Sequence, residues 1–166
     1  NAAPNVTHKA LAHLEQRGKV KAVVTQNIDG LHQVAGSKCV YELHGSVHRN
    51  YCMNCGKFFG LDAVLETDGV PKCSCGGTIK PDVVLYEEGL DGKTVSGAIA
   101  AIQNADLLVV GGTSLTVYPA AGMIDYFRGD KLILINKTVT PFDSRADIVI
   151  NESLGSVFKE ILEGDK

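Results

Sequence analysis

The chain has 166 residues, of which 45% are apolar, and a formal net charge of −3 at pH 7. This length corresponds to about one domain, and the composition is typical of a soluble globular α/β protein rather than a disordered chain. The absence of a basic excess argues against dedicated nucleic-acid binding, and no apolar run approaches the roughly 20 residues that span a bilayer.

The N-terminal part of the chain alternates between helical and strand patterns. Asn5 or Thr7 can cap a first helix, and Gly18 can end it. We predict that this helix is followed by a short buried strand at 21–25, a brief helix closed by Gly36, and a strand near 39–43.

The C-terminal part continues the alternation. We predict strands at 83–85, 105–115, 131–136 and 146–151, and helices at 94–104, 118–128 and 152–164. Strands that alternate with helices imply a parallel sheet with both faces covered. We therefore predict an α/β fold.

Residues 48–80 interrupt this pattern with two close cysteine pairs, C-x2-C and C-x-C, made by Cys52, Cys55, Cys73 and Cys75. Four thiolates can surround one tetrahedral zinc ion and leave no position open for substrate, so the predicted site is structural. Pairs of this kind without secretory marks favour metal over disulfides, and hence a reducing, cytoplasmic location. The alternative is a set of unrelated buried or free thiols.

Polar residues follow three of the predicted strands, in QNID (26–29), GGTS (111–114) and NK (136–137). In a parallel α/β sheet, ligands bind at the carboxyl ends of the strands. The two glycines permit close approach of the backbone, and the hydroxyls of Thr113 and Ser114 can contact phosphate or ribose oxygens. A single GGTS turn is more often ordinary loop chemistry. Together, however, the three segments predict a nucleotide at the sheet edge.

His44 lies in ELHGS, where the strand near 39–43 ends. A histidine has a reference pKa near 6.5 and can accept a proton near neutral pH. The alternative is a structural histidine, and the chain contains four further histidines: His8, His13, His32 and His48.

The motifs TQNIDGLH, ELHG, the two cysteine pairs, KPDVVLYEE, GTSLTVYPAA and ILIN occur in this order. Together they closely resemble the sirtuin family of NAD-dependent protein-lysine deacylases, its bacterial members most of all. The resemblance implies a Rossmann-like NAD-binding domain at 1–47 and 81–166, and a zinc-ribbon module at 48–80. It also implies NAD as the cofactor, one structural zinc ion, and acyl-lysine proteins or peptides as substrates.

The resemblance implies roles for residues near the predicted nicotinamide end of NAD. His44 would be the general base, with Asn27 and Asp29 also in the catalytic site. Asp29 and the backbone of Ile28 would hold the nicotinamide carboxamide. Gln26 and Asn27 would contact the nicotinamide ribose.

Two further groups of residues follow from the resemblance. Those implied to face the adenosine half of NAD are Gly112, Thr113, Ser114, Asn136 and Lys137, with a looser match at Ser153 and Leu154. Those implied to bind the peptide substrate as an added strand are Val83, Val84 and Tyr86. Tyr86-Glu87 stands where the family usually has Phe-Gly.

Sirtuins begin with a strand and a glycine-rich turn that binds the NAD diphosphate, and neither occurs in this chain. We therefore expect these residues alone to bind NAD weakly and to turn over poorly. Two alternatives to a deacylase are compatible with the sequence. One is an ADP-ribosyltransferase or NAD hydrolase on the same scaffold, and the other is a non-catalytic zinc-ribbon interaction module.

Overall fold

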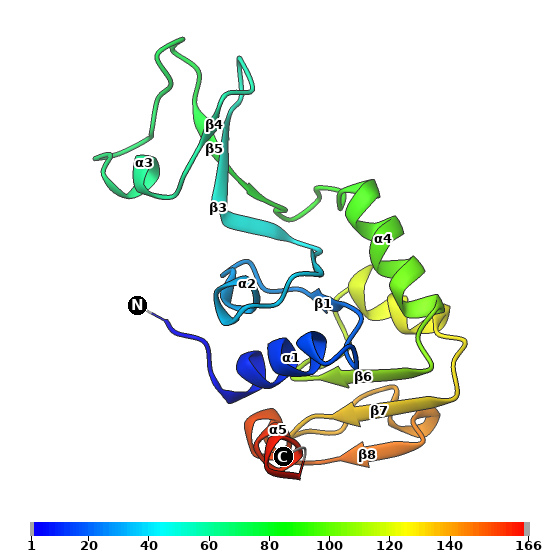
Figure 1. Ribbon diagram of the computed structural model, residues 1–166. Coiled ribbons are helices and arrows are strands. Elements are labelled where there is room, and N and C mark those ends of the chain that lie inside the picture. The colour runs from blue at the N-terminus through cyan, green and yellow to red at the C-terminus, as the bar shows by residue number, and fades with distance from the viewer. Residues whose placement is uncertain (1, 165–166) are drawn as a thin grey trace. The chain divides into compact units, whose positions relative to one another are not determined.

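The computed structural model describes residues 2–164, which divide into two compact units. The first, here called the sheet unit, contains residues 2–24, 31–41 and 92–164. The second, here called the cysteine unit, contains residues 25–30 and 42–91. The elements of both units are labelled in Figure 1.

The sheet unit is built on three parallel strands, β6 (Leu107–Gly111), β7 (Lys131–Ile135) and β8 (Ile148–Ile150), in the order β6-β7-β8. The predicted parallel α/β arrangement is confirmed. Each strand is short and apolar, as expected for a strand that is buried between helices.

The central strand β7 is covered on both faces because its side chains alternate in direction. Leu132 and Leu134 belong to a core with Ile124 and Phe142. Ile135 belongs to a second core, which also contains residues of the first and last helices.

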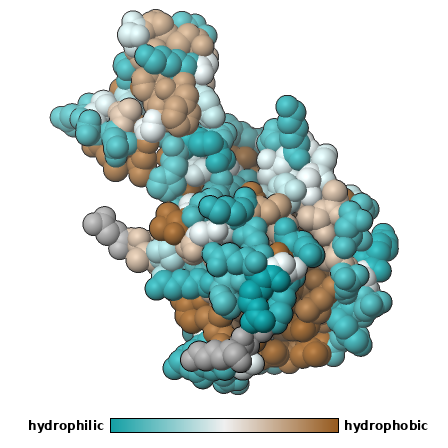
Figure 2. Space-filling model, viewed as in Figure 1, coloured by the Kyte–Doolittle hydropathy of each residue, from teal (hydrophilic) through white to brown (hydrophobic). Residues whose placement is uncertain are grey.

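The two outer strands are less well covered than predicted. Leu107 of β6 is 50% exposed, and Ile148 of β8 is 47% exposed. Apolar side chains accordingly reach the surface of this unit in Figure 2. The physical reason is position, because β6 and β8 are the edges of a three-stranded sheet and only β7 has neighbours on both sides.

Helices α1 (Val6–Gln16), α4 (Gly92–Gln103) and α5 (Leu154–Gly164) belong to the sheet unit. Asn5 caps α1, since its side chain accepts a hydrogen bond from the backbone N–H of His8. Gly18 follows the helix with φ +71°, a left-handed conformation that glycine adopts at little cost. None of the described helices is long and apolar enough to cross a bilayer.

The predicted helix at 118–128 is a 3₁₀ helix, η1 (Ala120–Tyr126), rather than an α-helix. Pro119 precedes it and Gly122 lies inside it, and these residue types have the weakest preference for an α-helix interior. A second 3₁₀ segment, η2 (Asp143–Arg145), precedes β8.

The chain passes between the units through β1 (Val23–Thr25) and β2 (Val40–Glu42), which pair with each other and flank α2 (Leu31–Ala35). The carboxylate of Glu15 on α1 accepts hydrogen bonds from the backbone N–H groups of Lys38 and Cys39, both at 2.8 Å. This interaction fixes the start of β2 against α1.

The cysteine unit contains an antiparallel sheet in the order β4-β3-β5, made by β3 (Gly45–Cys52), β4 (Phe58–Phe59) and β5 (Ile79–Val83), and the short helix α3 (Asp62–Leu65). Its small core consists of Cys52, Cys73 and Ile79, with Phe59 and Val64 packed against it. This unit contains the whole of the predicted 48–80 module together with flanking segments on both sides.

Candidate functional site

The four predicted cysteines meet in the cysteine unit. Their sulfur atoms all lie within 4.8 Å of one another. The Sγ atoms of Cys52 and Cys75 are 3.4 Å apart, and those of Cys55 and Cys73 are 3.7 Å apart. A tetrahedral zinc ion with Zn–S bonds of about 2.3 Å requires S···S distances of about 3.8 Å. The four thiols therefore fit one structural zinc ion.

Two tight turns present these sulfurs. The N–H of Gly56 donates to the carbonyl of Cys52, and the N–H of Gly76 donates to that of Cys73, both at 2.9 Å. Both glycines have positive φ, at +70° and +81°. Gly77 must also be small, because a Cβ there would lie 2.6 Å from the Sγ of Cys52.

The surroundings of Cys75 favour its thiolate. The backbone N–H of Gly77, followed by the thiol of Cys52 and the amide of Asn54, lowers the pKa of Cys75 to about 6. Zinc binds the thiolate form of cysteine. The pKa of Cys73 is also lowered, first by a hydrogen bond from the backbone of Cys75, so both thiols are disposed to bind metal as thiolates.

The predicted QNID segment lies beside residues 43–48 in the same unit. Three hydrogen bonds join them: His44 Nδ1 to Gln26 O at 3.0 Å, Val47 N to Ile28 O at 3.1 Å, and His48 Nε2 to Asp29 O at 3.0 Å. A fourth joins Leu43 N to the carbonyl of Thr25, directly before the segment, at 2.9 Å. The structure thus brings together the two motifs that carry the predicted base and the predicted nicotinamide contacts.

His44 lies in the turn between β2 and β3 and is half-buried. A backbone carbonyl can only accept a hydrogen bond, so the Nδ1 atom of His44 carries the proton that Gln26 O accepts. In the neutral ring this leaves Nε2 as the unprotonated nitrogen. The local geometry therefore prepares Nε2 to accept a proton.

Gly45 holds this turn close to β5, and we expect Gly45→Ala to destabilise the protein by about 2–4 kcal/mol. Its φ is +77°, and a Cβ would lie 1.9 Å from the carbonyl oxygen of Asp82. Denaturant unfolding measures the loss. Gly60→Ala is the matched control, since a Cβ at Gly60 meets nothing within 4 Å. Equal denaturant midpoints for Gly45→Ala and Gly60→Ala would contradict the close approach of Gly45 to the backbone of Asp82.

The residues predicted to bind a peptide lie at the end of β5. Val83 is its last residue, and the N–H of Val84 donates to the carbonyl of His44 at 3.1 Å. Tyr86 is fully exposed, at 101%. Glu87 has φ +70°. It stands at the position where the family named from the sequence motifs usually has glycine.

Glu88 closes the loop after β5. Its carboxylate accepts hydrogen bonds from the N–H of Leu85 at 2.9 Å and from the ammonium of Lys80 at 3.2 Å. The hydrogen bond from Leu85, followed by that from Lys80, lowers the pKa of Glu88 below its usual range.

A pocket in the sheet unit lies where β6, β7 and β8 end. Five residues predicted to face adenosine line it, together with Ile135 and Glu152: Gly112, Asn136, Lys137, Ser153 and Leu154. A glycine is required at 111 because a Cβ there would lie 2.3 Å from a side-chain carbon of Leu154. Packing of α5 against the GGTS turn therefore shapes this pocket.

The hydroxyls of Thr113 and Ser114 are used within the turn itself. Thr113 Oγ1 accepts from the N–H of Leu115 at 3.2 Å, and Ser114 Oγ bonds the hydroxyl of Thr116 at 2.7 Å. Neither residue belongs to the set that lines the pocket.

Sequence reasoning missed Glu152 in this pocket and the ion pairs of Arg49 in the cysteine unit. Glu152 had a usable signal, because it is the second residue after β8, as Lys137 is the second residue after β7. Arg49 had none, since its partners Glu42 and Asp82 lie on two other strands.

Comparisons with known proteins identify what this chain is similar to. The Sir2 family model matches residues 1–119. An NAD-dependent protein deacetylase of Clostridium acetobutylicum is 60% identical over 164 residues, which cover 98% of this chain and 67% of that protein. This chain therefore spans about two thirds of the length of that relative.

The chain is also similar to solved structures of Sir2 proteins. A Sir2 structure with a p53 peptide and NAD⁺ is 40% identical, with a TM-score of 0.91, and the match covers 99% of this chain and 71% of that one. A second Sir2 structure contains an inhibitor, 2′-O-acetyl-ADP-ribose and a deacetylated p53 peptide. It is 39% identical, with a TM-score of 0.91 and coverage of 99% and 73%.

Proposed function

The chain belongs to the Sir2 family, and we propose that it carries the NAD and acyl-lysine sites of an NAD-dependent protein deacetylase. In the reaction, acyl-lysine, NAD and one water give free lysine, O-acyl-ADP-ribose and nicotinamide. The observation that supports this proposal is the hydrogen bond between His44 Nδ1 and Gln26 O, because it leaves Nε2 of His44 available as a base.

Two separate groups of residues suit different parts of NAD. Gln26, Asn27, Ile28 and Asp29 would hold the nicotinamide end, and the pocket that contains Gly112, Asn136 and Lys137 would hold an adenosine end. Bound NAD supplies the ADP-ribosyl group that accepts the acyl group, with nicotinamide as the leaving group. Thr113 and Ser114 contribute to the adenosine end through the turn that they stabilise.

His44 acts as the general base. Its Nε2 would accept the proton of a ribose hydroxyl of bound NAD, which would make that oxygen nucleophilic for acyl transfer as the bond between the acyl carbon and the lysine nitrogen is given up. Nδ1 keeps its hydrogen bond to Gln26 O throughout, so the ring stays oriented while it takes up charge.

The acyl-lysine peptide binds along Val83, Val84 and Tyr86. β5 is an edge strand in the order β4-β3-β5, and an extended peptide can add to an exposed edge. The exposed ring of Tyr86 lies free to contact it. A net charge of −3 supports a protein rather than a nucleic acid as partner.

The zinc ion bound by Cys52, Cys55, Cys73 and Cys75 holds the cysteine unit together and takes no part in the chemistry, because four protein ligands leave no open position. A site made of four thiolates is compatible with the reducing environment of the cytoplasm, where we place the protein.

Nicotinamide release, measured with the complete protein and NAD, tests this function against its alternatives. We expect release to require an acyl-lysine peptide and to match deacylation one for one. Release without peptide would indicate an NAD hydrolase, and transfer of ADP-ribose to the peptide would indicate an ADP-ribosyltransferase. The absence of any NAD turnover would favour a non-catalytic interaction module.

A further inference from the structure

Strand β3 contains an irregularity next to the candidate site. It pairs with β5 at Ser46↔Asp82, and pairing resumes at Asn50↔Pro81. Three residues of β3, 47–49, lie between these pairs, while β5 has none in between. Residues 47–49, here called the β3 bulge, therefore leave the ladder.

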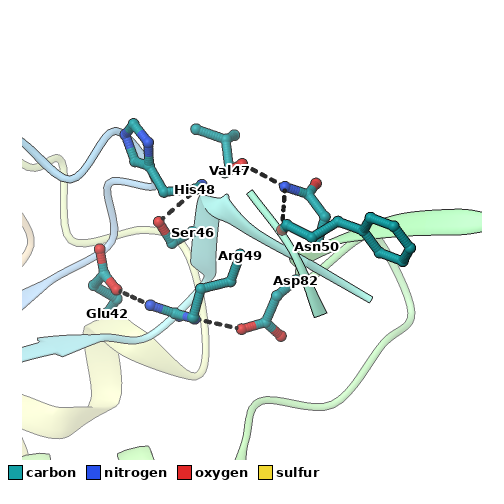
Figure 3. A network of polar contacts seen from close by, with 8 residues as sticks. Glu42, Ser46, Val47, His48, Arg49, Asn50 and Asp82 are labelled. Carbon is teal, nitrogen blue, oxygen red and sulfur yellow. Dashed lines mark hydrogen bonds and ion pairs between the residues drawn. The ribbon is translucent and has the colours of Figure 1, made fainter. Parts of the chain in front are cut away.

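The bulge is held by a buried side chain. Asn50 is 1% exposed, and its amide donates to the carbonyl of Val47 at 3.1 Å and to that of Phe59 at 3.4 Å. The N–H of His48 donates to the hydroxyl of Ser46 at 3.3 Å. Figure 3 shows these contacts around the bulge. A bulge with its own buried hydrogen bonds is a specified feature of the fold.

His48 leaves the bulge toward the QNID segment. Its Nε2 donates to the carbonyl oxygen of Asp29 at 3.0 Å. Its ring also lies against the next residue, since a Cβ on Gly30 would lie 2.9 Å from the Cδ2 atom of His48. The ring therefore fixes both the carbonyl of Asp29 and the backbone that follows it.

Arg49 leaves the bulge on the other side of the strand (Figure 3). Its Nη1 donates to Glu42 at 2.6 Å, and its Nε donates to Asp82 at 2.8 Å. The side chain of Glu42 is only 7% exposed, so its carboxylate depends on this partner. Glu42 lies two residues before His44, and Asp82 lies directly before Val83.

We propose that the β3 bulge is a positioning device for the reaction, in which His48 fixes the nicotinamide-binding segment and Arg49 fixes the His44 turn to the end of the peptide-binding strand. This inference rests on the proposed deacetylase function. Neither side chain contacts the reacting atoms. Each acts through the residues that it holds.

Loss of His48 and loss of Arg49 are expected to change different kinetic constants. Loss of one hydrogen bond to a group that the side chain positions corresponds to about a tenfold change in an equilibrium or rate constant. In the complete protein we expect His48→Ala to raise KM for NAD and the nicotinamide inhibition constant about tenfold, with KM for the peptide unchanged. His48→Gln restores both constants, because the glutamine amide can still donate to Asp29 O.

We expect Arg49→Ala to lower kcat and to raise KM for the peptide, each about tenfold, with KM for NAD unchanged. Arg49→Lys keeps the charge but cannot bridge two carboxylates in the same way, so it recovers at most part of the loss. Lys57→Ala, which removes a cation from the same unit, is the control and leaves all constants unchanged.

Zinc content and the unfolding midpoint are measured for each variant. If His48→Ala and Arg49→Ala each raised KM for both NAD and the peptide, and His48→Gln restored neither constant, the role of the two side chains would be purely structural. That result would overturn the inference. The inference would also be overturned if His48→Ala and Arg49→Ala had the same kcat and KM values as the unmodified protein. In that case His48→Gln and Arg49→Lys would show no change either. An unmodified protein without deacetylase activity would instead overturn the proposed function.

Discussion

Replacement of His44 by alanine is expected to lower kcat for NAD-dependent deacylation by about 10²–10⁴-fold, the usual contribution of a positioned general base. The structure explains why the loss is specific. The ring lies half-buried in a turn, and its Nδ1 donates a hydrogen bond to the carbonyl of Gln26. Steady-state deacylation of an acyl-lysine peptide measures the effect.

His13→Ala is the control for this variant, because His13 is an exposed histidine on α1 in the other unit. We expect it to retain full activity. His44→Ala is expected to keep the zinc ion and the unfolding midpoint of the unmodified protein. If His44→Ala retained more than about a tenth of kcat, a base at position 44 would be wrong.

Removal of zinc is expected to unfold the cysteine unit and to abolish deacylation. Cys52 and Cys73 are buried and make up much of that unit's small core with Ile79. Binding of a structural zinc ion contributes apparent free energies of about 10–16 kcal/mol to small domains, which such a core does not replace. Cys73→Ser should have the same effect as a chelator.

Proteolysis and metal analysis distinguish the two units in this experiment. Without zinc, cleavage is expected between Met53 and Thr78, while the sheet unit keeps its separate cores. Cys39→Ser serves as the control, since Cys39 lies outside the cysteine cluster. A zinc-free protein that resists proteolysis in this segment would contradict a structural role for the metal.

The sheet unit could be predicted from sequence because its signals are local. The predicted strands at 105–115 and 131–136 contain the continuous apolar runs 107–110 and 132–135, which is the pattern of buried parallel strands. The same local reasoning was wrong at 118–128, where Pro119 and Gly122 favour the 3₁₀ form that the structure contains.

Within the 48–80 module, only the metal ligands could be predicted. Cysteine spacing indicated the cluster, which the structure brings together within 4.8 Å. Strand β3 was not predicted, because its bulge breaks the alternation that identifies a strand. Asn50, one of the most deeply buried residues, also has a polar side chain that a pattern of apolar positions cannot detect.

Long-range pairing explains why parts of the candidate site escaped sequence reasoning. Arg49 meets Glu42 and Asp82 only because β3 bulges between two paired strands. In the GGTS turn, the sequence predicts ligand contacts for Thr113 and Ser114, and their hydroxyls also have partners within the turn. Side chains of these types often bond to their own neighbouring backbone.

The most direct test of the proposed chemistry is mass spectrometry of an acetyl-lysine peptide after incubation with NAD and the complete protein. We predict equal amounts of deacetylated peptide and O-acetyl-ADP-ribose, and neither product with His44→Ala. Free acetate formed without O-acetyl-ADP-ribose, or equal product yields from His44→Ala and the unmodified protein, would contradict it.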